Sequence, residues 1–272
     1  MSHHRAFLLR NALAALLMAC AAMHGTASED RSSPRFYFVQ ISDCHFGNGA
    51  HAARMRDIVD RVNALPMPIA CAVVTGDLTS DNITKAATLT AAAGAFARIK
   101  VPVHYLPGNH DIQVKHVEAT VNAYTNAFGP LASQAEYNGV EFLMLYTEPL
   151  RRPIRIAGYD PLAWLQAAIK TAGTKPVLVF HHTPPFEDFY DNQMHPGWPR
   201  AAREQWDRLI QSANVKAVIA GHFHRDELHW SGSVPCFVAS SVAGCWGRQG
   251  SFRLYEYDRG TVSYRTVYLE QP

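Results

Sequence analysis

Five short blocks of aspartate, asparagine and histidine occur in order along the chain, most of them shortly after an apolar run. The blocks are Asp43-Cys44-His45, Gly76-Asp77, Gly108-Asn109-His110-Asp111, His181-His182 and Gly221-His222-Phe223-His224. They combine carboxylate oxygens, an amide oxygen and imidazole nitrogens, with no obligatory thiolate. This mixture of ligands suits Mn, Fe, Zn or Co better than Ca or Mg. The series supplies enough groups to hold two metal ions.

The spacing within the blocks is compatible with shared coordination. Asp43 and His45 are two residues apart, so both can turn toward one ion where a strand ends and its pleat relaxes. Asp77 has two carboxylate oxygens and can bridge a pair of cations. Glycines at positions 76, 108 and 221 let the backbone turn sharply beside each ligand. Each block alone is more often structural, and it is their joint order that predicts a metal site.

The apolar pattern between the blocks predicts alternating strands and helices. Short apolar runs that indicate strands cover residues 36–41, 69–74, 101–106, 142–146, 177–180 and 215–220. Apolar residues at helical spacing separate most of these runs, as in the stripe of Met55, Ile58, Val59, Val62 and Leu65. Two runs rich in β-forming residues, 252–257 and 262–269, flank a turn at Asp258-Arg259-Gly260 and predict a hairpin.

This order of elements predicts an α/β fold with parallel strands, helices on both faces and a more antiparallel C-terminal part. Ligands of such sheets bind at the carboxyl ends of the strands. Asp43, Asp77, Asn109, His181 and His222 each come shortly after a predicted strand. We therefore expect the candidate ligands to meet at one edge of the fold.

In this order the blocks resemble the pattern of the calcineurin-like metallophosphoesterase family, which is D-x-H, GD, GNH[DE], H and GHxH. The matching blocks extend from Asp43 to His224, about two thirds of the chain. The resemblance implies a β-sandwich core flanked by helices and two divalent transition-metal ions, Mn, Fe or Zn. It also implies their ligands: Asp43, His45 and His224 for the first ion, Asn109, His181 and His222 for the second, and Asp77 as the bridge.

The resemblance further implies hydrolysis of a phosphate ester by a hydroxide held between the two metals. His110 is then the catalytic residue that faces the substrate and protonates or hydrogen-bonds the leaving alkoxide. The alternative is a catalytically silent, metal-containing binding or scaffold protein of the same fold. Loss of His110 or of a ligand is the expected signature of such a protein, and the sequence keeps all of them.

The motifs leave open whether the substrate is a phosphomonoester, a phosphodiester or a cyclic nucleotide. Residues 76–79 (GDLT) and 181–185 (HHTPP) are similar to the cyclic-nucleotide phosphodiesterase branch of the family. Residues 128–130 and 159–165 look more like broad phosphatase relatives. The purple acid phosphatases differ, because they use a ligand tyrosine shortly after the GD block, where Leu78 and Thr79 stand here.

Two residues beside the proposed ligands are assigned supporting roles. We expect His182 to lie behind the ligands or to serve in packing. Asp111 is expected either to orient His110 or to cap the helix that follows it.

Loops at the ligand edge commonly determine substrate choice. The candidates for substrate contact are Trp198, Trp246 and Arg248. Trp198 lies in the loop 186–199, and the alternative role for it is to pack this loop onto its own domain. The cluster of Arg151, Arg152 and Arg155 is interpreted as a solvated loop, and His195 as a surface group.

The amino terminus predicts export. Arg5 and Arg10 precede an apolar stretch at 12–23 that ends near Gly25-Thr26-Ala27. That stretch is shorter than the roughly 20 residues needed to span a bilayer, so residues 1–27 are interpreted as a secretory signal. A short linker (28–34) and a metallophosphoesterase domain (35–272) follow. We expect a periplasmic or secreted protein without a membrane span, and Cys20 leaves open a lipoprotein anchor.

Charge and cysteine content narrow the choice of partners. Removal of residues 1–27 takes away two arginines and no acid, so the formal charge falls from +2 to zero with histidines neutral. No basic field for nucleic acid remains, and a small phosphate ester is the expected partner. Cys44, Cys71, Cys236 and Cys245 allow three disulfide pairings, and free buried thiols are the alternative.

Overall fold

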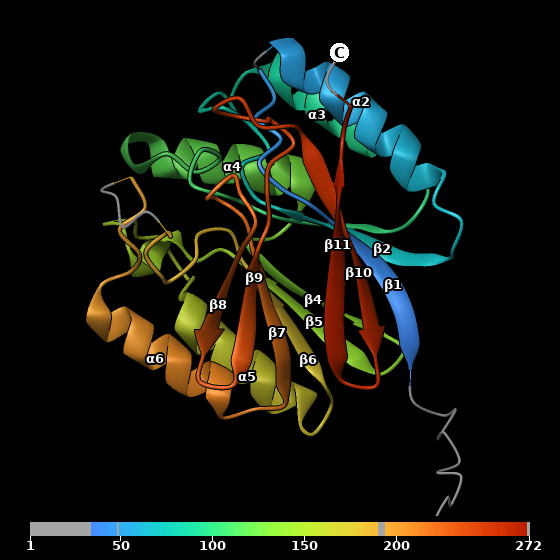
Figure 1. The fold of residues 1–272 in the computed structure, drawn as a ribbon. Helices are drawn as coiled ribbons and strands as arrows, with labels where there is room; N and C mark the ends of the chain where they lie inside the picture. Colours follow the sequence, from blue (N-terminus) through green and yellow to red (C-terminus); the bar gives the residue numbers. More distant parts are fainter. Residues whose placement is uncertain (1–33, 48, 190–193, 271–272) are drawn as a thin grey trace, which may run out of the picture. The chain divides into compact units, whose positions relative to one another are not determined.

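Two β-sheets pack face to face, and helices cover their outer faces (Figure 1). The computed structural model describes residues 34–47, 49–189 and 194–270. The first sheet has the strand order β11-β10-β1-β2-β3 and contains β1 (Arg35–Ile41), β2 (Ile69–Thr75), β3 (Val103–Leu106), β10 (Ser251–Asp258) and β11 (Thr261–Tyr268). The second has the order β4-β5-β6-β7-β9-β8 and contains β4 (Ala132–Tyr137), β5 (Val140–Leu145), β6 (Val177–Phe180), β7 (Val215–Ala220), β8 (Glu227–Ser231) and β9 (Val234–Val238).

The helices divide between the two outer faces. The first sheet packs against α2 (Gly49–Asn63), α3 (Ala86–Phe96) and α4 (Val117–Phe128), and the second against α5 (Pro161–Ala172) and α6 (Arg200–Gln211). Two short 3-10 helices, η1 (Val114–His116) and η2 (Glu148–Leu150), lie in the loops. The predicted β-sandwich core with flanking helices is therefore confirmed.

Side-chain alternation explains why the strands are apolar on both faces. In β1, Phe36 and Phe38 point into the core between the sheets, whereas Val39 and Ile41 pack against the helices. In β6, Leu178 and Phe180 face the other sheet. Strands buried on both sides need continuous apolar runs, and such runs were the strand signal in the sequence.

The strand directions bring the ligand loops to one edge. β1, β2 and β3 run parallel to one another, as do β5, β6, β7 and β9. The carboxyl ends of the parallel strands in each sheet therefore lie at one edge of that sheet, and the loops that follow them begin there. The C-terminal hairpin of β10 and β11 forms as predicted, and β10 pairs antiparallel with β1. The sequence analysis missed β4, β8 and β9. β4 and β8 are antiparallel edge strands with many polar residues, and β9 is short and contains Pro235.

Several predictions concern residues 1–33, which lie outside the described residues, including the export signal and Cys20. Among the helices that the structure describes, none is both long enough and apolar enough to cross a bilayer. The four cysteines of the described region are free thiols: Cys44, Cys71 and Cys236 are buried and Cys245 is partly buried.

Candidate metal centre

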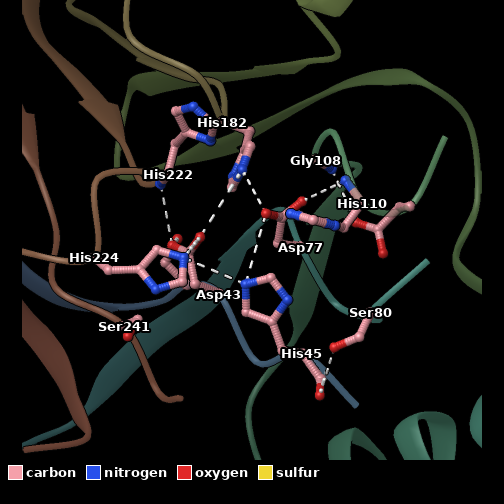
Figure 2. A network of polar contacts seen from close by, with 12 residues as sticks. Asp43, His45, Asp77, Ser80, Gly108, His110, His182, His222, His224 and Ser241 are labelled. Carbon is pink, nitrogen blue, oxygen red and sulfur yellow. Dashed lines mark hydrogen bonds and ion pairs between the residues drawn. The ribbon is translucent and has the colours of Figure 1, made fainter. Parts of the chain in front are cut away.

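The polar blocks converge at the carboxyl ends of five strands (Figure 2). Asp43 and His45 follow β1 and Asp77 follows β2, while the segment after β3 carries Asn109 and His110. His182 follows β6, and His222 and His224 follow β7. Apart from His110, all of these residues are buried.

The first group of potential ligands consists of Asp43, His45, Asp77 and His224. His224 Nε2 lies 3.1 Å from Asp43 Oδ1 and 3.3 Å from His45 Nε2. His45 Nε2 is 3.7 Å from Asp77 Oδ2. One ligand atom of each residue lies within 4.8 Å of the others, so one cation can contact all four.

The second group consists of Asp77, His182 and His222. His182 Nε2 lies 3.1 Å from Asp77 Oδ2, while its Nδ1 donates to the carbonyl of Thr75 at 2.8 Å. That hydrogen bond orients the ring so that Nε2 faces the group. Asn109, Asp77 and His222 line one cavity. Because Asp77 belongs to both groups, its carboxylate has the position of a bridge.

The structure assigns His182, not His181, to this group, which differs from the sequence expectation. The His181 ring packs on Trp206 and Trp198 at centroid distances of 4.9 and 5.6 Å, and its Nδ1 lies 3.5 Å from Thr147 Oγ1. Burial lowers its pKa to about 3. Val177 and Val179 pack on the helix side of the sheet, and His181 continues their alternation onto that face. The sequence did not reveal which face of β6 the helices cover.

The ligand loops hold strained backbone. Asp43, His45, Asp77, His222 and His224 all have positive φ angles, between 49° and 74°. A non-glycine residue in the left-handed region costs on the order of 1–3 kcal/mol and persists where the surroundings hold it, most often at functional sites. Three of the five blocks, those that follow β1, β2 and β7, therefore turn at the ligands themselves.

The three glycines beside the ligands serve two purposes. Gly76 has a positive φ of 87°, which agrees with the expected sharp turn. Gly108 and Gly221 instead provide space: a Cβ at Gly108 would lie 2.2 Å from Asp77 Oδ1, and one at Gly221 2.0 Å from Ser42 Oγ. The expectation of a sharp turn therefore holds for Gly76 alone.

Neighbouring groups orient the two carboxylates. Asp43 Oδ2 accepts hydrogen bonds from Ser42 Oγ at 2.6 Å and from the backbone N–H of His222 at 3.1 Å. Asp77 Oδ1 accepts the backbone N–H of His110 at 2.8 Å. Each carboxylate thus uses one oxygen for support and turns the other toward the histidines.

Asp111 has neither of the roles expected for it. Its carboxylate accepts the backbone N–H groups of Leu78, Thr79 and Gly108 at 2.8–3.1 Å, so it ties the loop after β3 to the loop after β2. Burial and the nearby Asp77 carboxylate raise its pKa to about 6, although these hydrogen bonds oppose the shift.

His110 is held by a carboxylate that the sequence analysis did not single out. Its Nδ1 lies 2.8 Å from Asp81 Oδ2, and its ring lies 5.1 Å from that of His45. The side chain is 40% exposed, in contrast to the ligands. Asp81 comes four residues after Asp77 in the same loop, and that spacing was the available signal.

Electrostatics couple the histidines to the two buried aspartates. Burial alone would raise the pKa of Asp43 and of Asp77, but His224 and His182 outweigh burial and lower both. Burial alone would lower the pKa of His182 and of His224, but these carboxylates raise them to about 9 and about 10. His182 and His224 therefore form imidazolium–carboxylate pairs with Asp77 and Asp43.

The residues fit a pair of cations. Asn109 Oδ1 and His222 Nε2 are buried and have no hydrogen-bond partner among the described residues, while Asp43 Oδ1 and His182 Nε2 contact His224 and Asp77 within the centre at 3.1 Å. Buried polar atoms are nearly always hydrogen-bonded. Carboxylate, amide and imidazole groups that face one another in this way are what metal coordination requires, once the imidazoles lose their protons.

A cavity of about 450 Å³ opens above these ligands. Its walls include Arg151, Arg152, His195 and Trp246, and Trp246 is 60% exposed. The expectation of a solvated surface position is wrong for His195, which is buried with its Nδ1 2.7 Å from Asp188 Oδ2. Arg151 and Arg152 also face the cavity and not only solvent.

The other two candidates for substrate contact lie elsewhere. Trp198 is buried, and its Nε1 donates to the carbonyl of Thr183 at 3.1 Å, so it packs the loop onto the domain. Arg248 donates to the carbonyl of His224 at 3.3 Å and does not line the cavity. Of the three predicted residues, only Trp246 borders the site.

The chain is similar in sequence to known phosphatases and phosphodiesterases. The serine/threonine-protein phosphatase CPPED1 of Danio rerio is 28% identical over 158 residues, which cover 53% of this chain and 48% of that protein. The chain thus spans about half the length of this relative. The glycerophosphodiester phosphodiesterase GpdQ of Enterobacter lignolyticus is 27% identical, over 68% of this chain and 69% of its own. A probable cyclic nucleotide phosphodiesterase of Colwellia psychrerythraea is 26% identical, over 70% and 71% of the two chains.

Solved structures share the fold. A dimetal phosphatase from Danio rerio superposes with a TM-score of 0.61 at 16% identity and covers 86% of this chain and 98% of its own. The sequence matches the family described as calcineurin-like phosphoesterase over residues 36–226, which include every block of the centre. The chain belongs to the calcineurin-like phosphoesterase family.

Proposed function

We propose that this protein hydrolyses phosphate esters at a centre of two divalent transition-metal ions, Mn, Fe or Zn. The observation that carries the proposal is the position of Asp77. Its carboxylate belongs to both ligand groups and also accepts the backbone N–H of His110. One residue therefore joins both ligand groups to the histidine that would face the substrate.

The residues divide between two ions. Asp43, His45 and His224 would hold the first ion, and the second would be held by Asn109, His182 and His222, with Asp77 shared. When bound, two such ions neutralise charge on the phosphoryl oxygens and lower the pKa of water.

His110 is suited to act on the leaving group. Its Nδ1 is occupied by Asp81, which fixes the ring and leaves Nε2 for the substrate. Burial lowers its pKa, but Asp77 and Asp81 outweigh burial and raise it. The raised pKa favours the imidazolium form, which can donate a proton to an alkoxide as it leaves.

The test is a set of esters offered to protein loaded with Mn, Fe or Zn. The esters are p-nitrophenyl phosphate, bis-p-nitrophenyl phosphate and cyclic nucleotides, since the relatives include phosphatases and phosphodiesterases. We expect hydrolysis of at least one ester class, dependent on added metal. Two bound metal equivalents without hydrolysis of any ester would refute the proposal and support a catalytically silent binding protein.

We also propose that the enzyme works outside the cytoplasm. The support is the sequence alone: Arg5, Arg10 and the apolar stretch at 12–23. The mature amino terminus of the native protein tests this. A start near Ser28 supports a soluble exported enzyme, a lipid-modified Cys20 supports an anchored one, and an intact Met1 in the cytosol refutes export.

A further inference from the structure

Two arginines line the cavity on the loop that follows β5. Arg151 and Arg152 border it together with the candidate ligands Asn109 and His222. We propose that these arginines form an anion subsite for a second negative charge on the substrate, so that the enzyme prefers dianionic phosphate esters. This inference rests on the proposed phosphate-ester hydrolysis and specifies its substrate class.

A buried carboxylate supports both guanidinium groups. The side chain of Glu148 is only 1% exposed. Arg151 Nε donates to both of its oxygens at 3.0 Å, and Arg152 Nε lies 3.1 Å from Oε2. Thr183 Oγ1 donates to the same carboxylate. Burying a carboxylate is costly unless it is paired and hydrogen-bonded, so these contacts form a defined support and not a solvated loop.

The backbone of this loop is also fixed. The 3-10 turn η2 precedes the arginines, and their N–H groups donate to the carbonyl of Glu148 at 3.1 and 2.9 Å. Ile154, at 4% exposure, anchors the far end of the loop in the core beneath the first sheet's helices. Side chains that are already ordered lose less conformational entropy when they bind an anion.

Both arginines keep donors free for a ligand. Each contacts Glu148 through Nε, and no hydrogen bond to a terminal nitrogen of either side chain occurs within the part of the chain that the structure describes. Two cations share one carboxylate, which leaves one net positive charge beside the centre.

The chemistry of the substrate explains the predicted preference. A phosphomonoester has three terminal oxygens and carries close to two negative charges above its second pKa of about 6. A simple diester has two terminal oxygens and one charge. Guanidinium groups pair with phosphate or carboxylate oxygens in a bidentate manner. The subsite thus favours a monoester, or a diester that carries a further acidic group.

Three esters with the same leaving group separate these cases. They are p-nitrophenyl phosphate, methyl p-nitrophenyl phosphate and carboxymethyl p-nitrophenyl phosphate, which differ in the number and position of their charges. The test variant is Arg152→Gln, because Arg151 and Thr183 still satisfy Glu148. The matched control is Arg155→Gln, since Arg155 is exposed on the same loop and does not line the cavity.

We expect Arg152→Gln to lower kcat/KM for p-nitrophenyl phosphate about 10- to 100-fold, the effect of one charge-assisted hydrogen bond, with little change for the methyl ester. Arg152→Lys should restore part of the loss, and Arg155→Gln should alter none of the three. A loss confined to the carboxymethyl ester also supports the subsite and places the second charge away from the reacting phosphoryl group. Equal losses for all three esters, or no loss for any, would overturn the subsite.

A binding measurement separates the subsite from turnover. Calorimetry on metal-loaded protein at about pH 8 compares inorganic phosphate, largely dianionic there, with monoanionic dimethyl phosphate. Arg152→Gln should weaken phosphate about tenfold or more and leave dimethyl phosphate unchanged. If phosphate binding depends on Arg152 but the protein hydrolyses none of the esters, the proposed hydrolysis is refuted and the anion subsite is supported. Hydrolysis with unaltered phosphate binding in Arg152→Gln would refute the subsite alone.

Discussion

Substitution of the neighbouring histidines His181 and His182 tests the metal centre, because only the loss of His182 is expected to weaken metal binding. In His182→Asn the amide nitrogen can still donate to the carbonyl of Thr75, as Nδ1 does at 2.8 Å, while the Nε2 that faces Asp77 at 3.1 Å is lost. Even groups that only orient ligands are worth about 10- to 100-fold in metal affinity, so loss of this ligand should weaken the second ion by at least that factor. The first ion should remain bound.

His181→Phe is the matched control. The ring continues to pack on Trp198 and Trp206, and a buried Nε2 without a hydrogen-bond partner is removed. We expect two bound ions and a free energy of unfolding that is unchanged or higher by about 1 kcal/mol.

Elemental analysis after dialysis against a weak chelator, with denaturant unfolding of each metal-free variant, measures both effects. The reasoning is refuted if His181→Phe loses the second ion while His182→Asn keeps it.

The remaining predictions concern catalysis, packing and pH. His110→Asn should keep two metal equivalents and lower kcat about 100-fold or more for esters with poor leaving groups, and less for p-nitrophenyl esters; equal losses would contradict proton donation. Gly108→Ala should reduce metal content and activity, because its Cβ would lie 2.2 Å from Asp77 Oδ1; a variant with normal metal content would contradict the close packing. Since the pKa values of His182 and His224 are raised to about 9 and about 10 in the ligand-free centre, metal uptake should release protons and weaken as pH falls, as calorimetry in buffers of different ionisation enthalpy can show. The same pairs stabilise metal-free protein fully below about pH 6.5, and denaturant unfolding should show this stability lost as pH rises through about 9 and about 10.

The apolar runs predicted most of the sandwich, because strands buried on both faces leave a clear signal in the sequence. The edge strands β4 and β8 were missed, since their exposed faces are polar and their sequences resemble loops. That the strands divide into two sheets came from the family resemblance. Strand pairing is set by contacts between residues far apart in the chain, which periodicity does not reveal.

For the site, the blocks and their convergence were predictable, but the side on which each residue projects was not. The sequence shows His181 and His182 as equivalent neighbours, and only the position of α5 and α6 distinguishes them. Asp81 was missed, and the pair Arg151 and Arg152 was interpreted as part of a solvated loop, for a related reason. Each acts through a partner on another segment or through a turn, and the sequence shows charge but not burial.

The most direct measurement of the central claim is anomalous diffraction from crystals of the manganese- or zinc-loaded protein. We expect two anomalous peaks that share the Asp77 carboxylate, one contacted by Asp43, His45 and His224 and the other by Asn109, His182 and His222. A single peak, or a second ion bound by His181 with Asp77 outside its coordination, would contradict the account.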